Sequence, residues 1–499
     1  MRELFTLPQL TVIFSSGWFV LLTVMICVVI ALENRDPTKT ISWLLVLTLL
    51  PGVGVVLYLL FGENLRKRHW SKTRTAVQEF WDSPEMQKVR EQKQAEQLRQ
   101  AMIMDADYFD LADRPIMKLV LNSGVAPILV DNQVDIYTEG EGKFAQLLED
   151  MKQAKDHIHL EYFIIKDSAI GREIQQVLIQ KAQEGVRVRL LFDDIGSWRL
   201  YLKPSFLRKL RQAGCEVASY LKARFPFIHR NFNYRNHRKI CVIDGRVGYV
   251  GGINIGDEYL HRDPKFGFWR DTHLRLEGPS VYMLQLVFLT DWFVATGQKP
   301  LAQKYFPQLT HEAGREGRSV IQIAVSGADS PQETIYQAYF YAIAQAKTSI
   351  YIQTPYFVPD EGLLTALKTA VLAGVDVRIM FPAIADHFCV YNASLSYLEE
   401  LMALGAKVHL YQKGFIHSKV VLVDGEMASV GTANMDIRSF MINSEINAFI
   451  YDDDTVKRLY QMFYDDLTHC VTLSYEAFRR KSLWQRSKES FCRLFSPLL

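Results

Sequence analysis

A short pattern of potentially catalytic residues occurs twice in the chain. A histidine is followed by a lysine at +2, an aspartate at +7, a glycine at +14 and an asparagine at +17. The first copy consists of His237, Lys239, Asp244, Gly251 and Asn254, and the second of His417, Lys419, Asp424, Gly431 and Asn434. Each fixed position matches by chance roughly one time in twenty, so the joint match indicates a duplication. The repeated pair predicts two half-sites that face each other across one cleft.

These residue types suit chemistry on a phosphodiester. Lysine places a point charge on non-bridging oxygens, and Asn254 and Asn434 supply amide donors. One histidine can attack phosphorus and form a phosphohistidine, while the other protonates the leaving alcohol and later deprotonates the incoming one. A lone histidine on a strand is usually a packed, half-buried residue, but two in register with lysines favour catalysis. The scheme needs no metal, and the sequence shows no cluster at metal-ligand spacing, so we expect neither a metal nor another cofactor.

Each copy of the pattern is predicted to lie on a β-hairpin. Strands are expected over 239–243 and 247–250, and over 419–423 and 427–430, with Asp-Gly turns between them. Residues two apart on a strand share a face, so each histidine projects beside its lysine. Asp244 and Asp424 belong to the catalytic motif by position, yet a short carboxylate in a turn commonly caps backbone amides. We therefore favour a structural role for both aspartates.

The repeat extends beyond the motif and defines the expected architecture. Residues 157–163 match 349–357, 185–192 match 374–381, and 213–217 match 404–408, in the same order before each motif. Short apolar strands that alternate with helical segments indicate an α/β fold with a mainly parallel sheet and crossover helices. Together with the motif hairpins, this predicts two pseudo-symmetric halves, 126–318 and 319–475, each a mixed sheet flanked by helices.

The N-terminal segment, 1–64, is predicted to form a two-helix transmembrane hairpin. Residues 11–32 and 41–61 carry no charge, and each stretch is long enough for a bilayer core. A charged link separates them, and a basic cluster at 66–74 follows the second stretch. The positive-inside rule then predicts a multi-pass chain with its catalytic body on the cytoplasmic side. Residues 65–125 are charged and indicate a helical connector.

Two further segments and the net charge bear on partners. Residues 197–237 mix aromatic and basic side chains, which suits an anionic lipid interface as well as single-stranded nucleic acid. The net charge of only +2 argues against a dedicated nucleic-acid binder, so we expect a lipid partner and no nucleic acid. Residues 476–499 form a basic amphipathic segment, either an interfacial helix or a packed terminal helix. The six cysteines form no Cys-x-x-Cys pair, which favours a reducing compartment.

The duplicated pattern resembles the signature of the phospholipase D superfamily. The resemblance implies that His237 is the nucleophile and that His417 is the general acid and base. It also implies that a carboxylate further along the chain orients each histidine. Glu445, at +28 from His417, matches that position, and Asp271, at +34 from His237, is its counterpart in the first half.

One departure from the family pattern affects substrate binding. The family often has a serine after the motif glycine, where this chain has Gly252 and Thr432. Both positions, with the two asparagines, are expected to bind the phosphate. Only Thr432 keeps a hydroxyl, so the first half lacks this contact.

A narrower resemblance involves both ends of the chain. Residues 35–45 (RDPTKTISWLL), 50–54 (LPGVG) and the ending LFSPLL are similar to the bacterial cardiolipin synthases of this superfamily. That resemblance implies an enzyme of the bacterial cell membrane that binds phosphatidylglycerol and cardiolipin and converts two phosphatidylglycerols into cardiolipin and glycerol. A phospholipase D hydrolase and a phosphatidylserine synthase remain alternatives, because their sites would look the same. A membrane-tethered nuclease is disfavoured by the charge, and a non-enzymatic scaffold by the intact motifs; the oligomeric state, including a homo-oligomer, is left open.

Overall fold

The structure is a computed structural model, and it describes most of the chain from residue 114 onward. The described residues are 114–124, 126–220, 233–299, 303–307, 319–327, 330 and 332–496, with shorter stretches at 17, 20–21, 23–28, 37–50, 52–61, 75, 77–84, 86–88 and 91. The chain forms two compact units, which are described separately. The smaller comprises Met1–Thr73 and Ala223–Asn233, and the larger comprises Arg74–Lys222 and Tyr234–Leu499.

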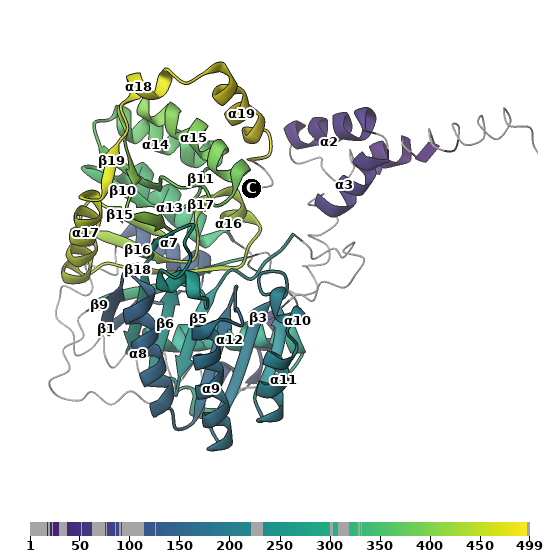
Figure 1. The fold of residues 1–499 in the computed structure, drawn as a ribbon, viewed down its shortest axis with the longest axis vertical. Coiled ribbons are helices and arrows are strands. Elements are labelled where there is room, and N and C mark those ends of the chain that lie inside the picture. Colours follow the sequence, from purple (N-terminus) through teal and green to yellow (C-terminus); the bar gives the residue numbers. More distant parts are fainter. Residues whose placement is uncertain are drawn as a thin grey trace, which may run out of the picture. The chain divides into compact units, whose positions relative to one another are not determined.

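The larger unit is built on one 15-stranded sheet, parts of which are labelled in Figure 1, and its strand order is almost a palindrome. The order is β19-β13-β12-β10-β15-β16-β18-β9-β1-β8-β6-β5-β2-β3-β4. Counted outward from the central β9–β1 pair, each strand of one half occupies the same place as the equivalent strand of the other half. β19 is an additional strand at one edge. This confirms the two pseudo-symmetric halves that the sequence repeat predicts.

The first half carries the first copy of the motif. Its strands are β1 (Leu129–Tyr137), β2 (His157–Tyr162), β3 (Arg187–Asp193), β4 (Glu216–Tyr220), β5 (Lys239–Ile243), β6 (Val247–Gly251), β7 (Phe268–Arg270) and β8 (His273–Glu277). Its helices are α8 (Gly140–Gln153), α9 (Ala169–Gln183), α10 (Arg199–Leu202), α11 (Ser205–Gln212), α12 (Ser280–Thr296) and the short 3-10 turns η1 (Asp257–Leu260) and η2 (Gln303–Tyr305).

The second half carries the second copy. Its strands are β9 (Ser319–Ser326), β10 (Ser349–Gln353), β11 (Phe357–Val358), β12 (Asp376–Pro382), β13 (Lys407–Tyr411), β14 (Gly414–Ile416), β15 (Val420–Val423), β16 (Met427–Gly431), β17 (Met435–Asp436), β18 (Glu445–Ile450) and β19 (Cys470–Thr472). Its helices are α13 (Thr334–Gln345), α14 (Glu361–Leu372), α15 (Phe388–Met402), α16 (Ile437–Met441) and α17 (Asp453–Leu467), with α18 (Tyr475–Arg479) and α19 (Leu483–Arg493) at the end; α7 (Pro115–Gly124) precedes β1.

The pairing within the sheet differs from the mainly parallel sheet expected. Among the described strands of the large sheet, parallel pairing joins only β2 to β3, β3 to β4, β10 to β12 and β12 to β13. The other neighbours in that sheet, among them β2 with β5 and β10 with β15, pair antiparallel. The parallel neighbours are joined by helical crossovers, as parallel pairing requires. The motif strands form antiparallel hairpins, and β1, β8, β9 and β18 also run antiparallel to their neighbours.

Local sequence explains why the crossover helices cover the sheet. In α9 the buried apolar residues Ile170, Ile174, Val177 and Leu178 recur at helical spacing, so one face packs inward. The hydroxyl of Ser168 accepts the backbone N–H of Gly171 and caps the helix start. One buried apolar cluster contains strand residues from both halves, so the two halves share a core.

The motif hairpins form as the sequence predicts. β5 and β6 pair antiparallel, as do β15 and β16. In the turns, Asp244 and Gly245 have φ of 54° and 65°, and Asp424 and Gly425 have φ of 55° and 73°. Two consecutive left-handed residues define the turn type that best matches strand twist, and an Asp-Gly pair tolerates it.

The smaller unit does not contain the continuous second helix expected over 41–61. Instead α2 (Pro37–Leu49) ends before Pro51 and α3 (Val53–Phe61) begins after Gly52, whose φ is 87°. Proline lacks an amide donor and glycine allows the left-handed turn, so this pair interrupts the helix. The rings of Trp43 and Tyr58 lie 5.1 Å apart, edge to face, which packs α2 against α3.

Other parts of the expected membrane hairpin cannot be compared with the structure. Most of residues 11–32 and of the connector 65–125 lies outside the described residues, as does 221–232 of the aromatic and basic segment. Within the described part of the chain, no helix combines the length and the apolar character needed to cross a bilayer.

Candidate active site

His237 lies directly before β5, at the boundary between the two halves. Its backbone N–H donates to the carbonyl of Ser444 at 2.9 Å. Its ring Nδ1 lies 3.0 Å from each carboxylate oxygen of Glu445, at the start of β18 in the second half. A carboxylate accepts only, so Nδ1 carries the proton and Nε2 keeps the free lone pair.

His417 lies directly before β15 and has the same surroundings by pseudo-symmetry. Its backbone N–H donates to the carbonyl of Arg270 at 2.7 Å. Its Nδ1 lies 2.7 Å from Oδ2 of Asp271, which follows β7 in the first half. The structure thus brings both motif histidines and both predicted orienting carboxylates into one region.

The pairing of histidine and carboxylate is the reverse of the one expected from the sequence. Spacing suggested Glu445 for His417 and Asp271 for His237, but each carboxylate binds the histidine of the other half. The cause is strand pairing across the boundary. β14, which leads to His417, pairs in parallel with β7, which leads to Asp271, and Asn236 forms a bridge with Ser444.

The two motif lysines lie buried beside their histidines. Nζ of Lys239 donates to the backbone carbonyl of His237 at 2.6 Å, and Nζ of Lys419 lies 2.8 Å from Nδ1 of His417 and also contacts that residue's carbonyl. Burial lowers the pKa of Lys239 to about 7 and that of Lys419 to about 8, although Glu445 and Asp271 oppose the shift. Two buried amino groups, close enough for Lys419 to lower the pKa of Lys239, suit an anionic ligand, which would raise both pKa values again.

Both motif imidazoles are neutral at pH 7 in the free protein. Burial lowers the pKa of each to about 4; the partner carboxylate raises it and the nearby lysines lower it. The lysine of each half affects the histidine of the other half, which shows how close the half-sites are. The pKa values of Asp271 and Glu445 lie below their usual range, because the adjacent His–Lys groups outweigh the effect of burial.

Asp244 and Asp424 lie at the far ends of the motif strands, in the turns. Asp244 accepts backbone N–H groups of residues 155, 156 and 157 at 2.8–2.9 Å. Asp424 accepts those of residues 347, 348 and 349 at the same distances. Each carboxylate therefore ties its hairpin to the start of the neighbouring strand, β2 or β10.

The two motif asparagines have different surroundings. Oδ1 of Asn254 accepts the backbone N–H of Ile164, and its amide donates to the hydroxyl of Tyr259 at 2.8 Å. Oδ1 of Asn434 is buried and has no hydrogen-bond partner in the described structure. This unpaired acceptor leaves Asn434 able to accept a hydrogen bond from a ligand donor such as a hydroxyl group.

The residues after the motif glycines also differ from the expected phosphate contacts. A Cβ at Gly252 would lie 1.9 Å from Oδ1 of Asp271, so glycine makes room for the carboxylate that orients His417. The hydroxyl of Thr432 instead bonds the backbone of Ile446, accepting at 2.9 Å and donating at 3.2 Å. Gly252 thus leaves space for Asp271, and Thr432 holds the backbone next to Glu445.

Two aromatic rings beside the histidines were not identified from the sequence. The ring of Phe163 lies 4.9 Å from that of His237, and the ring of Trp269 lies 5.4 Å from that of His417. Both are buried or half-buried and limit water near the imidazoles. The available signals were the position of Phe163 after the repeated strand and that of Trp269 two places before Asp271.

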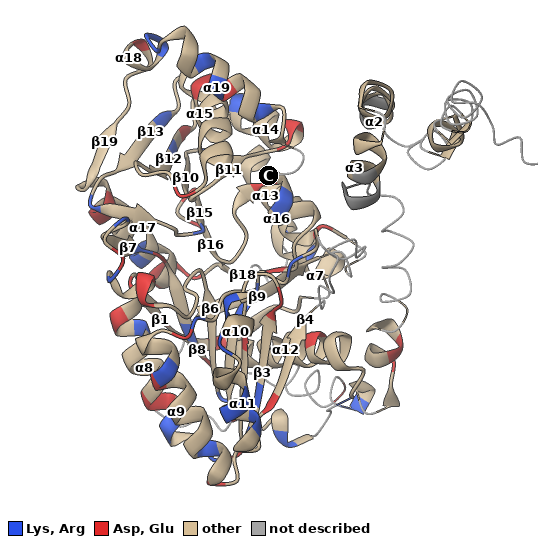
Figure 2. Ribbon diagram, turned by 45° about the vertical axis from the view of Figure 1, so that its right-hand side comes forward, with Lys and Arg blue, Asp and Glu red and all other residues tan. Residues whose placement is uncertain are grey.

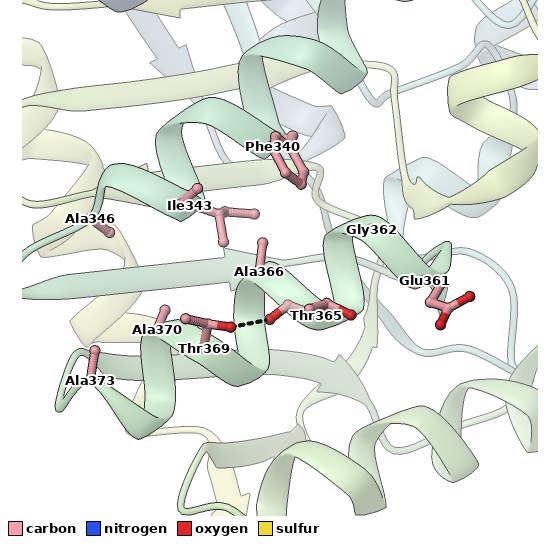
Figure 3. Close-up of a pocket in the computed structure, with 11 residues that line it drawn as sticks. Phe340, Ile343, Ala346, Glu361, Gly362, Thr365, Ala366, Thr369, Ala370 and Ala373 are labelled. Carbon is pink, nitrogen blue, oxygen red and sulfur yellow. Dashed lines mark hydrogen bonds between the residues drawn. The ribbon is translucent and has the colours of Figure 1, made fainter.

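Among the described residues, no group of three or more His, Cys, Asp or Glu side chains is arranged to hold a metal ion. A separate groove lies between α13 and α14, lined by Phe340, Ile343, Ala366 and Ala370 among others (Figure 3). No motif residue lines this groove.

Comparison with known proteins identifies the family. The model described as the cardiolipin synthase, phospholipase D-like domain matches residues 147–264 and 339–467, one match in each half. A model of the phospholipase D-nuclease N-terminal family matches residues 20–63. The cardiolipin synthase of Geobacillus kaustophilus (strain HTA426) is 44% identical over 95% of this chain and 92% of its own length. The chain belongs to the cardiolipin synthase family.

Further relatives support this membership along the whole chain. The major cardiolipin synthase of Bacillus subtilis (strain 168) is 44% identical over 98% of this chain and 99% of its own. Among solved structures, a phosphatidylserine synthase from Haemophilus influenzae Rd KW20 aligns with a TM-score of 0.59, covering 77% of this chain and 100% of its own, at 15% identity. At that identity, the likeness shows the shared fold alone. A member of the cardiolipin synthase family is an enzyme, and the cluster of two His–Lys pairs is the candidate for its active site.

Proposed function

We propose that the site transfers the phosphatidyl group of one phosphatidylglycerol to a glycerol hydroxyl of a second, which yields cardiolipin and glycerol. The observation that carries the proposal is the convergence of two His–Lys pairs, each with a carboxylate from the opposite half. Two similar half-sites suit a reaction in which the leaving and the attacking group are both glycerol hydroxyls.

The first step forms a phosphohistidine. Nε2 of His237 attacks phosphorus, the bond from phosphorus to the headgroup glycerol breaks, and His417 donates a proton to the leaving oxygen. The proton reaches His417 when the phosphodiester binds, because its negative charge raises the pKa of the imidazole. Lys239, Lys419 and Asn434 bind the non-bridging oxygens and stabilise the charge that develops on them.

The second step uses the same groups in reverse. His417 removes the proton of an incoming glycerol hydroxyl, whose oxygen attacks phosphorus as the bond to His237 breaks. Cardiolipin leaves, and His417 releases the proton to water because its pKa falls again once no phosphodiester is bound. Neither step requires a metal.

The surroundings of the site support a lipid substrate. Trp198 and Leu202 follow β3, Phe388 follows β12, and all three side chains are exposed. His237 and His417 lie at the same ends of the neighbouring strands, because β5 and β15 run antiparallel to β2 and β10. Exposed apolar side chains of both halves therefore lie at the strand ends that carry the histidines, which suits acyl chains.

We further propose that the N-terminal segment attaches the enzyme to the bacterial cell membrane, with the body on the cytoplasmic side. The uncharged stretches 11–32 and 41–61 and the basic cluster at 66–74 support this arrangement. The interruption at Pro51-Gly52 is compatible with a bent segment inside a bilayer if neighbouring groups satisfy the freed backbone.

The proposal is tested with purified full-length protein and phosphatidylglycerol labelled in its headgroup. We expect labelled glycerol and cardiolipin in equal amounts, and loss of both with His237→Ala or His417→Ala. Phosphatidic acid as the main product would show that the enzyme hydrolyses the lipid and does not transfer it. Formation of phosphatidylserine when serine is added would show that serine is the acceptor. A donor with a good leaving group should give a covalent adduct in His417→Ala; an adduct on His417 in His237→Ala would reverse the roles.

A further inference from the structure

Helix α19 turns its polar face toward the body of the protein. Glu489 and Cys492 are buried, and the Glu489 carboxylate accepts from Lys481 at 2.7 Å and from Gln485 at 2.8 Å. Gln485 also donates to Asn392 of α15 at 3.0 Å. Polar contacts, and not an apolar stripe, thus hold this helix against α15.

The outward face of α19 is apolar. The exposed fractions are 82% for Leu483, 73% for Trp484, 58% for Phe491 and 77% for Leu494. Leu483, Phe491 and Leu494 fall on one side at helical spacing, with the small Ser487 between them. A surface helix normally buries its apolar face, and a large exposed apolar patch indicates an interaction site.

The charges around this face identify the partner. Residues 476–499 contain six basic residues and two acidic ones, Glu476 and Glu489, and Glu489 is buried. Arg479, Arg480 and Arg486 are exposed, and Figure 2 shows basic positions along α19. Glu476 is exposed, but basic residues outnumber it, so the net exposed charge beside the apolar face is positive.

Two other partners fit this charge poorly. Helices α2 and α3 have the sequences PTKTISWLLVLTL and VGVVLYLLF, which contain no acidic residue. A second copy of α19 would bring the same positive charges together. An anionic lipid surface supplies both an apolar layer and negative headgroups.

We propose that α19 docks on an anionic bilayer, with Leu483, Trp484, Phe491 and Leu494 inserted among the acyl chains. This inference rests on the proposed function, because the bilayer is the one that supplies the phosphatidylglycerol. The contact holds the second half on the membrane independently of the N-terminal segment.

Depth-dependent fluorescence quenching tests the contact directly. Ser487→Cys, on the outward face, is labelled with an environment-sensitive dye in the full chain carrying Cys27→Ser, because Cys27 is exposed. Lys457→Cys on α17, with 74% of its side chain exposed, is the matched control, and the Cys27→Ser parent gives the background. Vesicles contain brominated lipid, with or without phosphatidylglycerol.

We expect quenching at position 487 when the vesicles contain phosphatidylglycerol. We expect no quenching at position 487 in neutral vesicles, and none at position 457 in either kind of vesicle. No quenching at 487, or equal quenching at both positions, would overturn the proposal. Self-quenching between copies labelled at 487 in the absence of lipid would assign the face to a second copy and also overturn it.

An activity measurement separates this inference from the proposed function. The fourfold variant Leu483→Ser, Trp484→Ser, Phe491→Ser and Leu494→Ser should lose transfer several-fold on vesicles but keep it in detergent micelles. Leu372→Ser, also at an exposed leucine, should lose neither. An equal loss in both media would contradict membrane docking. Failure of the unsubstituted protein to form cardiolipin in micelles would instead reject the proposed function.

Discussion

Burial holds the imidazoles of His237 and His417 neutral, with a pKa of about 4 for each. The proposed reaction, however, requires a different protonation state of each histidine. The nucleophile must be neutral, and the general acid must carry a proton. The same neighbours that bury the rings therefore favour attack by His237, and the bound phosphate must supply the charge that protonates His417. The carboxylates act in the same direction as the phosphate, because each raises the pKa of its histidine.

The crossed pairing predicts which limb of the pH–rate profile each carboxylate affects. Asp271→Asn should lower the pKa of His417. The general acid then loses its proton at lower pH, so the alkaline limb shifts to lower pH. Glu445→Gln should lower the pKa of His237. The nucleophile then remains neutral at lower pH than before, so the acid limb shifts to lower pH. Each variant should also lose roughly 10- to 100-fold in kcat through lost orientation. Profiles of kcat against pH that show the opposite limbs moving would contradict the pairing with the assigned roles.

The two asparagines should separate stability from substrate binding. Asn254→Ala leaves the Ile164 N–H and the Tyr259 hydroxyl unsatisfied, which should lower the free energy of unfolding by about 1–3 kcal/mol. Asn434→Ala removes a side chain whose Oδ1 has no described partner, so the melting temperature should stay nearly constant. The value of kcat/KM should fall, because the proposal has the amide N–H groups of Asn434 donate to the phosphate. Thermal unfolding and transfer kinetics measured on both variants would reveal the reverse pattern if Asn254 were the phosphate ligand.

Gly252 should tolerate no side chain. The added methyl group of Gly252→Ala would displace the Asp271 carboxylate and with it the orientation of His417. Transfer should fall by roughly 10²- to 10⁴-fold, the usual range for a lost general acid. Gly142→Ala is the control, because its Cβ would meet only the ring of Tyr137 at 3.4 Å or more. Full activity in Gly252→Ala would show that Asp271 does not position His417.

At the scale of the elements, the aspartates of the two turns hold the motif hairpins to the strands beside them. Asp244→Ala or Asp424→Ala frees three backbone N–H groups that are exposed or partly buried, where water replaces part of the lost bonding, so each should lower the free energy of unfolding by about 1–3 kcal/mol in total. The folded fraction should keep its kcat, because both carboxylates lie at the strand ends opposite the histidines. A loss of kcat without a loss of thermal stability would assign them to the chemistry.

The hairpins, the two halves and the convergence of the histidines could be predicted because each depends on local spacing or on the repeat. Asp-Gly turns, the lysine two places after each histidine, and strands that recur in the same order before each motif are all visible in one dimension. The exchange of Glu445 and Asp271 could not be predicted, since it depends on β14 pairing with β7 across the boundary of the halves. The break between α2 and α3 was signalled by Pro51-Gly52, but the uncharged stretch around it favoured a single span.

At the scale of the whole molecule, the arrangement across the membrane can be tested by labelling. A cysteine at Thr38 should react with an impermeant reagent added outside intact cells, and one at Lys72 should react only after permeabilisation. The physical reason is the basic cluster at 66–74, which the proposed orientation places on the cytoplasmic side. Cys27→Ser provides the parent for both variants. Labelling at Lys72 from outside would place the body on the other side of the membrane.

A ribosome adds about 5–20 residues per second, so His237 is synthesised roughly 10–40 s before Glu445, which lies 208 residues later. Through that interval the first half has its histidine and lysine but not the carboxylate that sets the imidazole tautomer. Asp271, made 146 residues before His417, waits in the same way for its own partner. A partly made chain therefore lacks the orienting carboxylate of His237 and the whole second half-site, and on the proposed mechanism it becomes fully reactive only when its own synthesis is nearly complete.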